Sequence, residues 1–193
     1  QQGVRVGRED FAIRLAARGQ AVDYIAQGTV QYRDRQLVPV LVTDSLGVPT
    51  SYEVTVRIAD DITEVWKGNI VRGRMSARIQ TPRGQLAREY VLPDGTLIVD
   101  DGVFHHYYFV ARHHTKGSVN VLVPRSNTQS RWAITSAGEE RLTIGTTDLQ
   151  ATHLVLTDAA GVQRDLWIDA DGRVLKVVLP SSGIVATRDD PPR

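Results

Sequence analysis

The stretch Asp100–His114, DDGVFHHYYFVARHH, decides the fold because it is the segment with the pattern of a buried helix. Its apolar residues recur at the spacing of one helical face, at Val103, Phe104, Tyr107, Tyr108 and Ala111. Phe109 and Val110 carry apolar surface almost around the helix, and such a helix must be enclosed by other elements. Asp100 stands at the expected N-cap. We therefore expect a helix over about residues 100–114 inside the core.

Outside this stretch, apolar and polar residues alternate with the two-residue period of half-buried strands, as in residues 52–58, YEVTVRI. Turn signals such as Pro93-Asp94-Gly95 separate the strands and predict hairpins. The sequence thus predicts a mainly β fold, with a single antiparallel meander sheet curled into a half-barrel. One aromatic α-helix is expected to plug the concave side of that sheet. Phe104, Tyr107 and Tyr108 are expected at the centre of its core.

Two segments carry residues that restrict their conformation. Residues 37–42 are apolar on both faces, but Pro39 cannot donate a ladder hydrogen bond, which predicts an edge strand or a bulge. Asp169-Ala170-Asp171-Gly172 imitates the start of a calcium loop. The bidentate glutamate of such a loop would fall at Pro180, so a tight turn is expected there.

The chain has 193 residues, a net charge of +1 and no cysteine. This length fits one domain over residues 1–193 with short N- and C-terminal tails. The small net charge argues against nucleic-acid binding, and the missing cysteine excludes disulfides and thiolate sites. Nor is any apolar run long enough to predict a transmembrane span. Because the chain begins with Gln1 instead of methionine, we expect an exported, periplasmic protein whose signal peptide has been removed.

Four histidines, His105, His106, His113 and His114, are candidate metal ligands. His106 and His113 would share a helical face, but seven residues separate them by about 10 Å along the axis. A metal ion needs nitrogen ligands about 2 Å away, and the HExxH spacing is absent. We therefore expect no metal site, with these imidazoles on the polar rim and C-terminal end of the helix.

Arg72, Arg74 and Arg78 are candidate partner-binding residues. They are expected on one face of a strand whose other face carries Val71, Met75, Ala77 and Ile79. Guanidinium groups fork onto carboxylates and phosphates, so other protein subunits or anionic lipid headgroups would suit this stripe. The alternative is a solvated sheet face that acidic residues on a neighbouring strand balance.

Two segments together carry a family resemblance: DDGVFHHYYFVAR and the closing meander RDLWIDADGRVLKVVLPSSGIVATRDDPP. They resemble a broad family of exported bacterial β-rich domains of unknown function, similar in architecture to the lipoprotein-localisation-factor half-barrels. The resemblance covers roughly Tyr52 to Pro191. It implies a half-barrel fold and a hydrophobic ligand, and it supplies no catalytic or ligand-binding residues.

No nucleophile elbow, phosphate-binding loop or dinucleotide fingerprint occurs, so no catalytic or cofactor-binding residue is predicted. The favoured function is a non-catalytic binding or scaffolding module. Such a module would be an accessory subunit on the outer face of a bacterial membrane assembly, such as a respiratory or photosynthetic complex. The alternative is a periplasmic carrier or sensor of a lipid or acyl ligand, and an enzyme ranks third. An open cavity beside the helix would favour the carrier, whereas a filled one would favour the scaffold.

Overall fold

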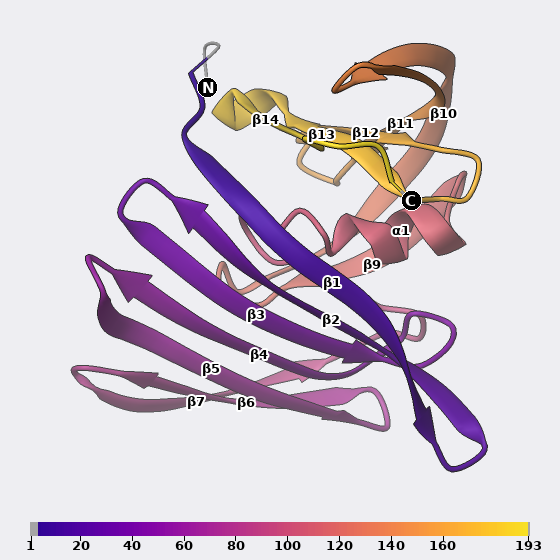
Figure 1. The fold of residues 1–193 in the computed structure, drawn as a ribbon. Coiled ribbons are helices and arrows are strands. Elements are labelled where there is room, and N and C mark those ends of the chain that lie inside the picture. The colour runs from indigo at the N-terminus through magenta and orange to yellow at the C-terminus, as the bar shows by residue number, and fades with distance from the viewer. Residues whose placement is uncertain (1–3, 193) are drawn as a thin grey trace.

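A computed structural model describes residues 4–192 and contains two seven-stranded sheets. The first, called sheet A, is an antiparallel meander in which every strand pairs with the next one along the chain (Figure 1). Its strands are β1 (Gly7–Arg18), β2 (Ala21–Tyr32), β3 (Arg35–Thr43), β4 (Pro49–Ile58), β5 (Asp61–Val71), β6 (Arg74–Thr81) and β7 (Gly84–Val91).

Sheet B contains the second half of the chain in the order β14-β13-β12-β11-β10-β9-β8. Its strands are β8 (Leu97–Ile98), β9 (Gly117–Val123), β10 (Thr128–Ile144), β11 (Thr147–Thr157), β12 (Gln163–Ile168), β13 (Val174–Leu179) and β14 (Ile184–Thr187). A short 3-10 helix, Pro180–Ser182, connects β13 to β14. Only β8 and β9 pair in parallel among the described strands.

The predicted mainly β fold with one α-helix is confirmed, but the chain forms two sheets instead of one continuous meander. The break falls at Pro93-Asp94-Gly95, which was expected to close a hairpin. After this turn the chain leaves sheet A, and Leu97 and Ile98 pair in parallel with β9. A parallel pair needs a long crossover connection, and the segment that carries the helix supplies it.

The helix, α1 (Tyr107–His113), is half the length that the periodicity predicts. Residues 100–106 form turns, and Gly102 has a positive φ of 75° that a helix does not allow. Asp100 is not the N-cap, since its carboxylate binds residues distant in sequence. The helix begins after His106, which makes no side-chain capping bond. The apolar pattern is therefore real, but it extends across an irregular turn.

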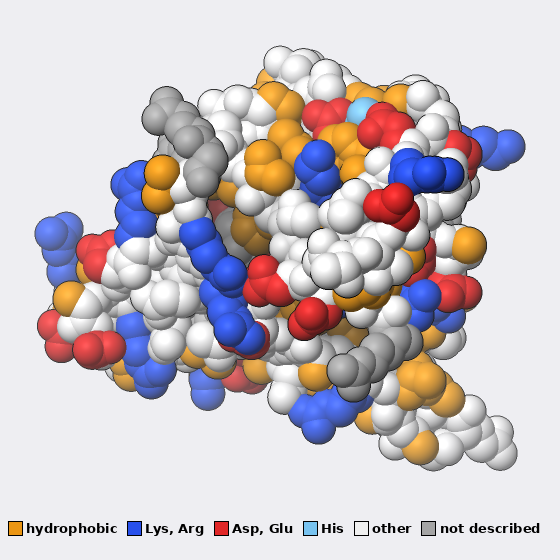
Figure 2. All heavy atoms as spheres, turned by 45° about the horizontal axis from the view of Figure 1, so that its top comes forward, with side chains coloured by type: hydrophobic (Ala, Val, Ile, Leu, Met, Phe, Trp, Pro, Cys, Tyr) orange, Lys and Arg blue, Asp and Glu red, His pale blue; other side chains and the backbone are white. Residues whose placement is uncertain are grey.

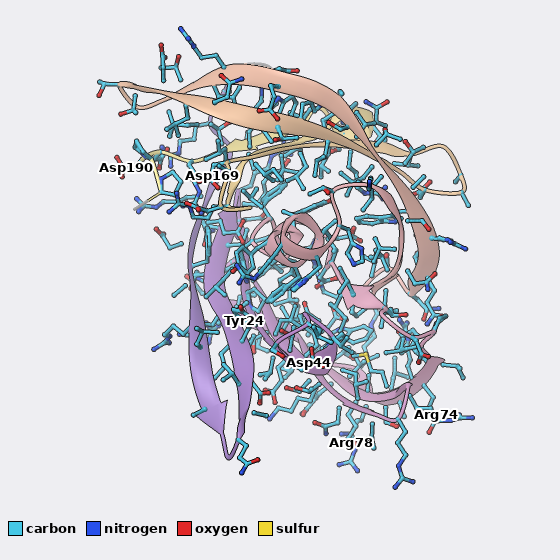
Figure 3. The ribbon with its side chains drawn as sticks, turned by 90° about the vertical axis from the view of Figure 1, so that its right-hand side faces the viewer. Tyr24, Asp44, Arg74, Arg78, Asp169 and Asp190 are labelled. Carbon is cyan, nitrogen blue, oxygen red and sulfur yellow. The ribbon has the colours of Figure 1, made fainter. Side chains whose placement is uncertain are left out.

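The main core lies between the two sheets and encloses α1 (Figure 3). Tyr107 is buried, as expected, whereas Phe104 and Tyr108 are partly exposed and pack against the core's edge. The largest fully buried side chains alternate inward from their strands: Tyr52, Trp66, Met75 and Ile79 from sheet A, and Leu122, Trp132 and Ile134 from sheet B. The two sheets thus bury one shared apolar interior.

Pro39 lies in an interior strand, because β3 pairs with both β2 and β4. The edge position predicted for this residue is wrong. The ladder between β2 and β3 is interrupted instead: Gln27 pairs with Val40 and Val30 pairs with Leu37, while no pairs join the residues between them. The missing N–H of Pro39 is accommodated by this gap, since its pairing with Val54 of β4 is regular.

Candidate functional site

A buried charged cluster joins the two sheets beside α1. Asp100, between β8 and α1, accepts a hydrogen bond of 2.5 Å on Oδ2 from the hydroxyl of Tyr52 on β4. The same oxygen accepts a 2.5 Å hydrogen bond from Nε of Arg125, which lies in the turn between β9 and β10. Arg125 also donates to the backbone carbonyl of Asp101. One carboxylate therefore connects a strand of sheet A to a turn of sheet B.

This cluster is shielded from solvent: the exposed fraction is 0% for the Asp100 side chain and 9% for Arg125. A buried carboxylate is tolerated only where opposite charge and hydrogen bonds compensate for its lost hydration. Burial raises the pKa of the Tyr52 hydroxyl well above its ordinary value, and the neighbouring Asp100 carboxylate raises it further. Tyr52 therefore stays a hydrogen-bond donor to Asp100.

Glu9 of β1 makes a second link between sheet A and the segment that leads into α1. Its carboxylate accepts the backbone N–H groups of Phe104 at 3.0 Å and His105 at 3.1 Å, and it contacts Nδ1 of His105. The His105 ring also stacks on Phe11 with 5.2 Å between ring centroids. β1, the edge strand of sheet A, is thereby fixed to the turn before the helix.

The polar-rim positions predicted for His105 and His106, at the N-terminal end of α1, are wrong. His105 is 2% exposed and His106 is 0% exposed. Nδ1 of His106 accepts the backbone N–H of Asp100 at 3.2 Å. Burial lowers the pKa of His106 well below its usual value, and the neighbouring His105 and Arg125 lower it further.

The four helix histidines do not come together. The rings of His105 and His106 are 4.8 Å apart, while His113 and His114 stand at the other end of α1. Within residues 4–192, no group of three His, Asp or Glu side chains is arranged to hold a metal ion. Burial lowers the pKa of both His113 and His114, which favours the neutral form of each imidazole. This shared shift does not make them a site.

A cavity of about 830 Å³ lies on the side where β1 faces β13 and β14. Its apolar lining includes Val6 just before β1, Phe11 of β1, Leu37 of β3, Phe104, Val177 of β13 and Ala186 of β14. Charged side chains of both signs surround its opening, which Figure 2 shows as a hollow in the surface. The buried links adjoin this cavity, because Arg125, Glu9 and His105 are among the residues that line it.

Two contacts cross the opening of this cavity. Arg5 pairs with Asp189 at 2.9 Å, and both side chains are more than half exposed. The guanidinium of Arg188 lies 5.4 Å from the ring centroid of Phe11, a cation–π contact between the C-terminal segment and β1. No sequence pattern predicts this arrangement, because these partners lie more than 170 residues apart and only the folded chain pairs them.

The predicted arginine stripe is only partly formed. Arg74 and Arg78 are exposed on the outward face of β6, and Met75, Ala77 and Ile79 are buried on its other face, as expected. Arg72 instead lies in the turn between β5 and β6 with a positive φ of 50°, and Val71 is 65% exposed. The reason is that the chain reverses at Arg72-Gly73, so the alternation does not run through the turn.

A second polar cluster, which the sequence analysis missed, lies on sheet B. His153 contacts Glu140 and Asp165 through its two ring nitrogens, each at 2.9 Å, and stacks on Trp167 with 4.2 Å between centroids. Trp167 donates its indole N–H to Glu140 at 2.8 Å. These contacts hold the β10–β11 hairpin against β12, a structural role that accounts for every polar atom involved.

Comparison with known proteins supports the fold. No family model and no curated protein matches the chain. A β-barrel-like protein of the domain of unknown function DUF1849 from Brucella abortus is similar, with a TM-score of 0.53 and 7% identity. The match covers 90% of this chain and 82% of that one. A protein of the DUF1089 family from Pseudomonas aeruginosa has a TM-score of 0.49 at 15% identity, covering 90% and 89% of the two chains.

The first of these likenesses supports the β-rich, barrel-like architecture that the sequence resemblance implied. At this identity it describes the fold alone. Among the described residues, no helix is long and apolar enough to span a membrane.

Proposed function

We propose that this protein is a non-catalytic carrier that holds an elongated, mainly apolar ligand such as an acyl chain. The observation that supports the proposal is the cavity between β1 and β13–β14. Its volume of about 830 Å³ falls within the range of small-molecule sites, about 300–1,000 Å³. An open cavity beside the helix segment is the feature that distinguishes a carrier from a module whose interior is filled.

The distribution of polarity supports a ligand with an apolar body and a polar end. Apolar side chains from both sheets and from Phe104 line the interior of the cavity. The ion pair Arg5–Asp189 and the guanidinium of Arg188 lie at its opening. An acyl chain would bury its methylene groups inside, and its head group would stay among the charged side chains.

The cavity can open without disturbing the buried links. The Arg5–Asp189 pair is exposed, and exposed ion pairs contribute only about 0–1 kcal/mol. Glu9 meanwhile fixes β1 to the segment before α1 through three contacts. The opening can therefore widen at Arg5 while the base of the cavity keeps its shape.

The scaffolding role in a membrane assembly is the second candidate function. The observation in its favour is that Arg74 and Arg78 point outward from β6 and are free to meet an acidic partner (Figure 3). An exported, periplasmic location belongs to both proposals, as does likeness to the lipoprotein-localisation factors. Fractionation of the source cells, with immunodetection of this protein in each fraction, measures the location directly.

A binding titration with cis-parinaric acid, a fluorescent fatty acid, tests the carrier. Wild-type protein should bind this probe with a saturable stoichiometry near one. Ala186→Trp should lower the affinity at least tenfold because the indole would fill the cavity that Ala186 lines. Ala87→Trp, on the exposed face of β7, is the matched control and should bind like wild type. Absence of saturable binding, or equal binding by both variants, would reject the carrier.

A further inference from the structure

One end of sheet A has a surface composition unlike the rest of the sheet. Because neighbouring strands are antiparallel, successive turns of the chain lie alternately at the two ends of the sheet. Register places the β1–β2 turn, the β3–β4 loop, the β5–β6 turn and the end of β7 at the same side. The end pairs are Arg18 with Ala21, Thr43 with Pro49, Val71 with Arg74, and Arg74 with Val91.

This end collects large apolar side chains that are exposed. They are Leu15 at 65%, Val22 at 42%, Leu46 at 68%, Val71 at 65% and Val91 at 64%. Single exposed apolar residues are common on protein surfaces and need no explanation. Here, however, five of the eleven exposed large apolar residues found in the described chain share one end of one sheet.

Basic side chains are interspersed among these apolar ones. Arg14 and Arg72 are exposed at this end, and Arg74 lies between Val71 and Val91 in the register. We call Arg14, Leu15, Val22, Leu46, Val71, Arg72, Arg74 and Val91 the basic rim. Of two further acidic residues near it, one is buried and the other is partly buried. Asp23 is 7% exposed, and Asp44 accepts the backbone N–H groups of Leu46 and Val48 at 2.9 Å each.

The opposite end of sheet A provides an internal contrast. It also exposes apolar residues, Ile62 at 51% and Leu86 at 56%. There, however, the exposed Arg33, Arg35 and Arg83 are balanced by the exposed Asp34, Asp60 and Asp61. Near the basic rim, Glu89 and Asp94 are exposed, against the three exposed arginines Arg14, Arg72 and Arg74. An anionic surface would therefore attract the basic rim more strongly than the opposite end.

The β1–β2 hairpin also projects beyond its neighbour. β3 pairs with β2 only as far as Tyr24, which lies opposite Leu15, so the tip over residues 16–23, which carries Val22, extends past the sheet (Figure 1). Figure 2 shows the tip as a protrusion with apolar side chains on its surface. Apolar side chains on such an element can enter the headgroup boundary of a bilayer by about 5–10 Å, while arginines contact lipid phosphates.

From these observations we propose that the basic rim binds the surface of an anionic lipid bilayer. The proposal goes beyond ligand binding and does not depend on it. The two features share one strand, because β1 lines the cavity with Gly7 to Phe11 and would reach the bilayer with Leu15. Four residues separate Phe11 from Leu15, about 13 Å of extended strand. Binding at the rim would hold the cavity wall close to the lipid surface.

Co-sedimentation with vesicles tests the proposal. Wild-type protein should bind vesicles of equal parts phosphatidylglycerol and phosphatidylcholine, and binding to phosphatidylcholine alone should be at least tenfold weaker. Leu46→Asp should weaken binding to the anionic vesicles at least tenfold. Leu86→Asp, an equivalent change at the opposite end, should stay within twofold of wild type. Both residues are exposed, so thermal melts should show both variants folded.

A matched pair of charge reversals distinguishes binding through the basic rim from nonspecific attraction between arginines and anionic lipid. Arg74 and Arg78 lie on the same face of β6, but Arg78 is four residues farther from the rim. Arg74→Glu should weaken binding at least fivefold, since one arginine near a membrane contributes about that factor. Arg78→Glu should change it less than twofold. Equal losses at these two positions, or no binding to anionic vesicles, would overturn the proposal. Uptake of cis-parinaric acid would be unaffected by that failure.

Discussion

Two ion pairs that border the cavity between the sheets lie in opposite surroundings. Beside α1, Asp100 pairs with Arg125 at 2.5 Å, and both side chains are buried. Between β1 and the C-terminal segment, Arg5 pairs with Asp189 at 2.9 Å, and both side chains are exposed. The first pair is part of the interior, whereas water competes for the second. The shielded pair Asp100–Arg125 therefore fixes the two sheets where it stands. The exposed pair Arg5–Asp189 can break, so the cavity can open there.

The largest effect is expected at the buried pair. Asp100→Ala should lower the free energy of unfolding by about 3–5 kcal/mol, because it leaves the Arg125 guanidinium buried without its partner. Urea denaturation at neutral pH measures this loss. In the double variant Asp100→Asn/Arg125→Met both charges are absent, so its cost should be less than the sum of the single changes. Simple additivity would mean that the two residues do not act as a pair.

Glu9 is expected to have an intermediate effect, since it fixes β1 at the base of the cavity. Glu9→Ala should cost about 2–3 kcal/mol, because the N–H groups of Phe104 and His105 lose a charged acceptor. The neighbouring Asp10 binds only Arg8, and both are more than half exposed, so Asp10→Ala should cost less than about 1 kcal/mol. Similar denaturation midpoints for the two variants would contradict the role assigned to Glu9.

Acid should first loosen the region around the buried ion pair. The pKa of His106 in the folded protein is lowered by burial, so the unfolded chain binds more protons below pH 6.5. Stability is therefore complete above about pH 6.5 and declines as the pH falls, by at most about 1.4 kcal/mol per pH unit for one proton. Urea melts from pH 7.5 to 5.5 measure the slope. His106→Asn should flatten it, since the amide oxygen can accept the Asp100 N–H without titrating. An unchanged slope would assign the effect to other groups.

The smallest effect on stability is expected at the exposed pair. Arg5→Ala should change the free energy of unfolding by about 0–1 kcal/mol, because an exposed pair contributes little. It should nevertheless speed the release of bound cis-parinaric acid in stopped-flow measurements, since one contact across the opening is removed. A loss of stability as large as that of Asp100→Ala would contradict the difference inferred between the shielded and the exposed ion pair.

Local patterns predicted the strands well where alternation and turns coincide. β4 spans Pro49–Ile58 and contains the alternating residues 52–58 that predict a strand, and β6 buries Met75, Ala77 and Ile79 as expected. The division into two sheets could not be predicted. A turn such as Pro93-Asp94-Gly95 specifies a reversal of the chain, but it does not specify which strand the next segment pairs with.

Most contacts of the candidate site could not be predicted from the sequence, for a related reason. Glu9 occupies one charged position on an alternating strand, and the N–H groups that it accepts are about 95 residues away. His105 was assigned to a polar rim because an imidazole on an apolar helix is usually exposed, and only the distant Glu9 explains its burial. The length of α1 was overestimated since Asp100 is drawn to Tyr52 and Arg125 by tertiary contacts.

The arrangement of the chain in two consecutive meanders has a consequence for the order of folding. Residues 7–91 contain all of sheet A, and every strand in it pairs with a sequence neighbour. Such local pairings close short loops at low entropic cost and form early. Sheet A can therefore assemble while the ribosome is still adding the second half of the chain. Its inner face stays uncovered until Asp100 and the helix arrive, so the unfinished protein exposes its future core for the time needed to synthesise about half of its length.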